Sequence, residues 1–123
     1  MIRASLAILV WAVLACAARG DELAECRRLA PKYNAECEVI LHDGTRVDLL
    51  SDELAIEVDK PEAWQQSIGQ AVLYAIHTGR KPAVILLVKD PATEYRHLVR
   101  AALVCGHLGI KLYLEPVAEG NSK

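Results

Sequence analysis

Three acidic residues, Asp48, Glu57 and Asp59, lie among alternating apolar residues in the segment RVDLLSDELAIEVD, residues 46–59. The alternation predicts two strands joined by a short turn, in a register that sets Asp48 opposite Glu57 and Arg46 opposite Asp59. Like charges opposite each other cost up to about 1 kcal/mol. A divalent cation would turn that cost into a binding site; the alternative is a solvated strand face.

The predicted ligands are those of a hard cation. Mg²⁺ takes one or two carboxylates together with water and phosphate oxygens, so Asp48 and Glu57 are candidate ligands for Mg²⁺ or Mn²⁺. Asp59 has two interpretations: a third carboxylate of the metal site, or the partner of Arg46 in a structural ion pair. Period-two alternation predicts the core-facing residues of the two strands: Val47, Leu49, Ile56 and Val58.

The elements that must position these residues follow from periodicity and turn signals. We expect helices over residues 21–30, 62–78 and 93–109, and strands over residues 37–42, 46–51, 54–59, 81–90 and 110–116. The order is α-β-β-β-α-β-α-β, in which an antiparallel meander is followed by helical crossovers. This order predicts an α/β fold with a mixed sheet flanked by helices.

The helix over residues 62–78 is predicted to be amphipathic. Its core face is expected to carry Trp64, Ile68, Ala71, Val72 and Ala75. The opposite, polar face is expected to carry Gln66, Gln70, Tyr74 and His77. Gly79 is the predicted C-terminal cap.

The chain resembles the PD-(D/E)XK, or restriction-endonuclease-like, nuclease superfamily. The residues that carry the resemblance are Asp48, Glu57 in A-I-E-V, and Gln70 and Tyr74 in Q-A-V-L-Y. The resemblance spans about residues 21–90 and implies an αβββαβ core. More narrowly, residues 55–86 look like a group of small bacterial proteins with A-I-E-V-D and G-Q-x-x-x-Y patterns.

The resemblance implies a Mg²⁺-dependent hydrolase that cleaves phosphodiester bonds of nucleic acid. Asp48 and Glu57 would bind the metal, and Gln70 and Tyr74 would position the substrate. Asp59 stands where the motif has its lysine, so the neighbouring Lys60 is the candidate replacement.

The resemblance also implies that an acid of the first helix, Glu22 or Glu25, lies near the site.

The sequence departs from the motif of this superfamily at two positions. Val47 stands where the motif has proline, and Asp59 replaces the motif lysine. The alternative is therefore a non-catalytic binding module on this fold, which recognises a protein or a component of the cell envelope.

The N-terminus has the pattern of an export signal. Arg3 precedes an apolar run of 14 residues, and Ala15-Cys16-Ala17 fits a cleavage site, so residues 1–17 are predicted to be a signal peptide and 18–123 a single domain. We expect a periplasmic or secreted protein without a membrane span in its mature chain. Lipid attachment at Cys16 is the minor alternative.

Charge and cysteine content refine this interpretation. Removing residues 1–17 takes away Arg3 and no acid, which moves the formal net charge from −2 to −3, so the chain has no overall basic character for binding a polyanion. In an oxidising compartment, Cys26 and Cys37 are predicted to form a disulfide. Cys105 lies in an apolar helical run and is expected to be a buried free thiol.

Overall fold

The computed structural model describes residues 21–120 and has the predicted order of elements. Residues 21–29 are helical, and the remaining elements follow in this order: β1 (Glu36–Ile40), β2 (Arg46–Leu50), β3 (Leu54–Asp59), the single-turn 3-10 helix η1 (Pro61–Ala63), α2 (Trp64–Thr78), β4 (Lys81–Val88), α3 (Pro91–Leu108) and β5 (Lys111–Pro116). The signal peptide and Cys16 lie outside the described residues.

The five strands form one mixed sheet in the order β1-β2-β3-β4-β5. β1 and β2 pair antiparallel, as do β2 and β3, whereas β3, β4 and β5 run parallel. The prediction of an α/β fold with a mixed sheet flanked by helices is confirmed. Among residues 21–120, none of the helices has the length and hydrophobicity that crossing a membrane requires.

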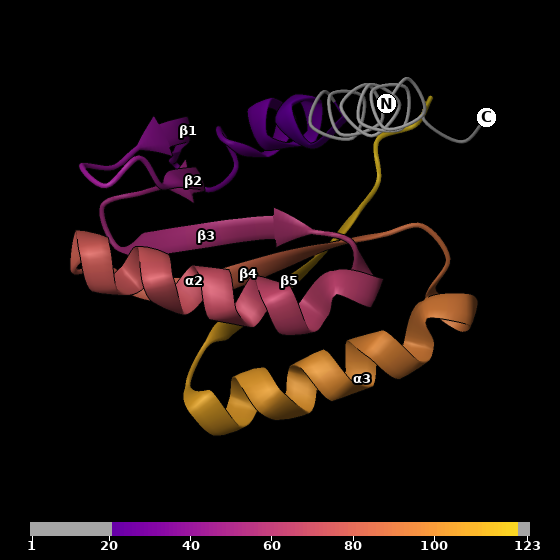
Figure 1. The fold of residues 1–123 in the computed structure, drawn as a ribbon. Helices are drawn as coiled ribbons and strands as arrows, with labels where there is room; N and C mark the ends of the chain where they lie inside the picture. Colours follow the sequence, from indigo (N-terminus) through magenta and orange to yellow (C-terminus); the bar gives the residue numbers. More distant parts are fainter. Residues whose placement is uncertain (1–20, 121–123) are drawn as a thin grey trace, which may run out of the picture.

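Helices cover both faces of the sheet (Figure 1). The helix of residues 21–29 packs Cys26 and Leu29 against Leu49, Ile56 and other apolar side chains of one face. On the other face, α2 lies over β3 and β4, and α3 lies beside it over β5. β3 and β4 are therefore buried on both sides, which explains their nearly continuous apolar sequences.

Local signals fix the ends of both long helices. α2 ends at Gly79, whose φ of 71° lies in the left-handed region, and the Gly79 N–H donates to the carbonyl of Ala75. α3 begins after Asp90, whose side chain accepts a hydrogen bond from Ala92 N, and Glu94 accepts from the backbone N–H of Asp90 at 2.7 Å. Capping therefore starts α3 two residues earlier than the predicted helix.

Two predictions about packing are wrong. The four β2 and β3 residues expected on one core face are all buried, but Val47 packs with Ala55 and Tyr74 rather than with Leu49 and Ile56. On α2, Tyr74 is 5% exposed while Val72 is 36% exposed, so the helix is rotated toward its tyrosine.

The predicted disulfide between Cys26 and Cys37 is not formed. Cys26, Cys37 and Cys105 are free thiols. Cys26 is buried beside Leu29, and Cys37 packs against the same cluster as an apolar group. Burial raises the pKa of the Cys37 thiol, and a hydrogen bond with Cys26 acts in the opposite direction. Cys105 is buried in the cluster under α3, as expected.

Candidate active site

The candidate site is centred on the point where β2 and β3 stop pairing. Leu49 pairs with Ile56 and Leu50 with Ala55, which is the register expected from the sequence. At the next residue of β2, Asp48, the backbone pairing with β3 has ended. Its carboxylate oxygen Oδ2 instead accepts a hydrogen bond of 2.9 Å from the backbone N–H of Val58. The Asp48 side chain therefore reaches across to β3 and holds the separating strands together.

This position brings the carboxyl groups of Asp48 and Glu57 into hydrogen-bond contact. Glu57 is 5% exposed. Burial, and then the charge of Asp48, raise the pKa of Glu57 to about 10. Burial also raises the pKa of Asp48, against the opposing effect of its hydrogen bond from Val58. At neutral pH the pair therefore shares a proton, with Glu57 as the donor and Asp48 as the acceptor.

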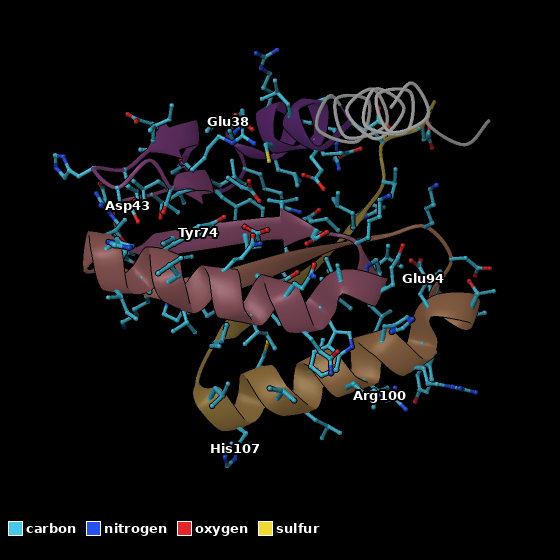
Figure 2. All side chains as sticks on the ribbon, in the orientation of Figure 1. Glu38, Asp43, Tyr74, Glu94, Arg100 and His107 are labelled. Carbon is cyan, nitrogen blue, oxygen red and sulfur yellow. The ribbon has the colours of Figure 1, made fainter. Side chains whose placement is uncertain are left out.

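Gln70 and Tyr74 approach Glu57 from α2. With its amide nitrogen facing Glu57, Gln70 donates hydrogen bonds of 2.7 and 3.3 Å to the two carboxyl oxygens. The Tyr74 hydroxyl lies 3.3 Å from the Gln70 amide group. Figure 2 shows Tyr74 between α2 and the sheet. Burial, followed by the nearby Glu57, raises the pKa of the Tyr74 hydroxyl, which remains a hydrogen-bond donor. The structure brings both residues to Glu57; Gln70 is exposed, as expected for the polar face of the helix, whereas Tyr74 is buried.

Asp59 lies beside the pair with partners of its own. Its Oδ1 accepts from the backbone N–H of Lys60 at 2.8 Å, and its Oδ2 accepts from the Ser67 hydroxyl at 3.2 Å. Burial raises the pKa of Asp59 against these two hydrogen bonds. Ser67 is fully buried, and its single hydroxyl hydrogen is shared between Asp59 and Ala63 O, which lies 2.9 Å from Oγ. The sequence interpretation missed Ser67, although it lies three residues before Gln70 on the same helix.

The predicted ion pair between Arg46 and Asp59 is wrong. Arg46 Nη1 lies 3.2 Å from Glu38 Oε2 on β1. Glu38 is opposite Asp48 in the β1–β2 register, yet its backbone has a φ of 57°. This left-handed conformation is unusual for a glutamate. The ion pair gives the Glu38 carboxylate a cationic partner next to the acidic site.

A cleft of about 360 Å³ reaches Asp59 but is not lined by Asp48 or Glu57. It lies at the carboxyl ends of the three parallel strands, the edge at which α/β proteins commonly bind ligands. Asp59, Lys60 and Lys89 line it, and Lys60 is exposed there. Lys60 therefore lies near the acids although it is one position removed from the motif lysine. The cleft is predominantly acidic, since its lining residues include six acids and two lysines.

The structure distinguishes the two acids of the first helix. Glu25 binds Arg28 at 2.6 Å and accepts a hydrogen bond from Ala118 N at 3.1 Å, so it has a structural role. Glu22 faces the site: burial raises its pKa, and the charges of Asp59 and Asp48 raise it further. Glu22 is therefore the acid of the first helix that adjoins the candidate site.

The donor set suits a metal ion only in part. Asp48 and Glu57 offer two carboxyl groups that share a proton, which a cation could displace. Across residues 21–120, no group of three or more His, Cys, Asp or Glu side chains is arranged to hold a metal ion. A cation would therefore need water or substrate oxygens to complete its coordination.

Comparisons of the chain with protein-family models, with curated proteins and with solved structures found no match.

Proposed function

We propose that this protein is a Mg²⁺- or Mn²⁺-dependent nuclease of the restriction-endonuclease-like type, exported from the cell. The observation that carries the proposal is the geometry of Asp48 and the buried Glu57: Asp48 bonds to β3 where the two strands separate, and Gln70 of the following helix contacts Glu57. Burying two adjacent carboxyl groups costs stability at neutral pH, and such costly groups cluster at functional sites.

Each residue has a role in the proposed reaction. Asp48 and Glu57 would hold the cation, which supplies polarisation of the phosphate and an attacking water of lowered pKa. Lys60, exposed in the adjoining cleft, would stabilise charge on the phosphate. Gln70 and Tyr74 would donate hydrogen bonds that orient Glu57 and the substrate backbone. Ser67 would keep the Asp59 carboxylate turned toward α2.

The acidity of the cleft supports a requirement for a cation. Its six acids and two lysines would repel a phosphate backbone that arrived without counterions. A divalent cation between the carboxylates and the phosphate removes this repulsion. Activity should therefore disappear in a chelator and return when Mg²⁺ or Mn²⁺ is added.

The experiment is a cleavage assay on single- and double-stranded DNA and RNA, with metal or with chelator. The purified protein is compared with Asp48→Ala, Glu57→Ala and Lys60→Ala. Glu53→Ala is the matched control, because Glu53 is an exposed acid in the β2–β3 turn. We expect at least a hundredfold loss in Asp48→Ala and Glu57→Ala and unchanged activity in Glu53→Ala. Cleavage that persists in chelator or in Glu57→Ala contradicts the proposal.

The second candidate is a non-catalytic binding module for a protein or an envelope component. The observation that favours it is Asp59, an acid bound by Ser67 at the position where the motif has its lysine. A module of this kind should cleave none of the four substrates. It should also show no increase in melting temperature with Mg²⁺ or Mn²⁺, since a ligand that binds the native state stabilises it.

A further inference from the structure

β5 forms one edge of the sheet, and its outer side is regular and unpaired within residues 21–120. The Val117 N–H donates to Val88 O on β4. Because backbone groups alternate along a strand, the N–H and C=O of odd-numbered residues in β5 point toward β4. Those of Leu112 and Leu114 point outward. An edge of this kind is a template for pairing with another strand.

The side chains of this edge are also suited to association. Leu112 packs in the cluster under α3, and Leu114, two positions on, lies on the same face with 52% exposure. The opposite edge of the sheet differs, because β1 carries two glutamates and its Glu38 has a positive φ. β5 is therefore the edge with a regular backbone, and it exposes Leu114.

We propose that two copies of this chain associate through antiparallel pairing of their β5 strands about a two-fold axis at Tyr113. In this register Leu112 of one copy and Leu114 of the other form a hydrogen-bonded pair, and symmetry repeats the pair, which gives four backbone hydrogen bonds. On the other face, Lys111 lies opposite Glu115 of the second copy, whose buried carboxylate is already bound by Lys32 and Tyr33 of its own chain, so the backbone bonds carry the pairing.

Neighbouring registers are less favourable. An axis at Leu112 would pair Ile110 with Leu114, but the Ile110 N–H already donates to Cys105 O. An axis at Leu114 would pair Leu112 with Pro116, which has no N–H to donate and whose carbonyl accepts from Arg28. The Tyr113 register alone among these three uses free donors and acceptors throughout.

The first test is the mass of the full-length protein in solution, measured by analytical ultracentrifugation over a range of concentrations. Leu114→Lys places two charges in the proposed ladder and should yield monomers. Ile76→Lys is the matched control, because Ile76 is 73% exposed on α2 and lies outside the proposed interface. Wild type and Ile76→Lys should be dimeric. A monomeric wild type, or a Leu114→Lys variant that remains dimeric, overturns the proposal.

The second test concerns the register. Residues at the axis of a non-hydrogen-bonded pair have Cα atoms about 4.5 Å apart, within the range of a disulfide. Tyr113→Cys should therefore cross-link two chains in oxidised glutathione. Lys111→Cys is on the same strand and face, but its symmetry mate lies about 13 Å away along the strand, so it should not cross-link. Circular dichroism verifies that both variants fold, and cross-linking of Lys111→Cys instead of Tyr113→Cys rules out this register.

Discussion

Replacing Glu57 with glutamine should stabilise the folded protein at neutral pH. The Glu57 carboxyl is 5% exposed, and burial together with Asp48 raises its pKa from the ordinary 4.5 to about 10. The folded state therefore binds the proton more tightly than the unfolded state. The stabilisation from this proton is complete below pH 4.5 and is lost as the pH rises toward 10. Glutamine is neutral at every pH and has the same shape as the protonated side chain.

The magnitude follows from the linkage between proton binding and stability. One proton that is bound in the folded state and released in the unfolded state changes stability by about 1.4 kcal/mol per pH unit. Between pH 5 and 7 the wild-type protein should lose roughly 2.5 kcal/mol on account of Glu57. For a domain of about 100 residues, this corresponds to a decrease of about 10 °C or more in melting temperature. Glu57→Gln should lack this part of the decrease and melt above wild type at pH 7.

The assay is thermal unfolding followed by circular dichroism between pH 5 and 8 in chelator. Glu53→Gln serves as the control, because Glu53 is an exposed acid and its replacement should change stability by less than about 0.5 kcal/mol. Adding Mg²⁺ at pH 7 should raise the melting temperature of wild type and leave that of Glu57→Gln unchanged. A variant less stable than wild type at pH 7 would show that Glu57 is ionised and well partnered, and would refute the reasoning.

Three further predictions concern the scaffold. Leu49→Ala empties a fully buried position between the first helix and the sheet and should cost about 2–5 kcal/mol in chemical denaturation; a cost below about 1 kcal/mol would contradict this packing. Tyr33→Phe removes the 2.6 Å hydrogen bond to the buried Glu115 and should cost about 1–3 kcal/mol in the same measurement, whereas a neutral result would mean that Lys32 alone satisfies this carboxylate. Gly69→Ala and Gly79→Ala should have opposite signs in thermal unfolding, because a Cβ meets nothing within 4 Å at either position but only Gly79 has a positive φ; we expect a gain of about 0.5–1 kcal/mol for the first and a loss of about 1 kcal/mol for the second, and equal signs would contradict the assigned backbone conformations.

The sequence predicted the strands and their register because both depend on local patterns. Alternation defined β2 and β3, and the short turn between them fixed the pairing of Leu49 with Ile56. The continuous apolar run of β4 indicated burial on both faces. The separation of the strands at Asp48 was not predicted, because it depends on a side chain that replaces a backbone hydrogen bond.

Residues of the candidate site were predicted better than their surroundings. Asp48, Glu57, Gln70 and Tyr74 lie together, but the tyrosine was assigned to solvent because it shares a helix side with glutamine and histidine. The tyrosine can be buried because Glu57 of β3 provides a polar partner between the helix and the sheet. Helical periodicity alone does not predict such a partner. Likewise, the ion pair between Arg46 and Glu38 depends on the positive φ of Glu38. The sequence gives no sign of that conformation, because the residue is not a glycine.

The ties between the first helix and the last strand have a consequence for the order of folding. Arg28 donates to Pro116 O, Lys32 binds Glu115, and Glu25 accepts from Ala118 N, across 88, 83 and 93 residues of sequence. Closing such long loops is slow compared with forming hairpins and helices. Glu22 is carried by the helix that these contacts fix in place. A chain still emerging from a ribosome or a translocation channel would therefore hold an incomplete acidic cluster, and the site would be assembled only after the last strand had been released.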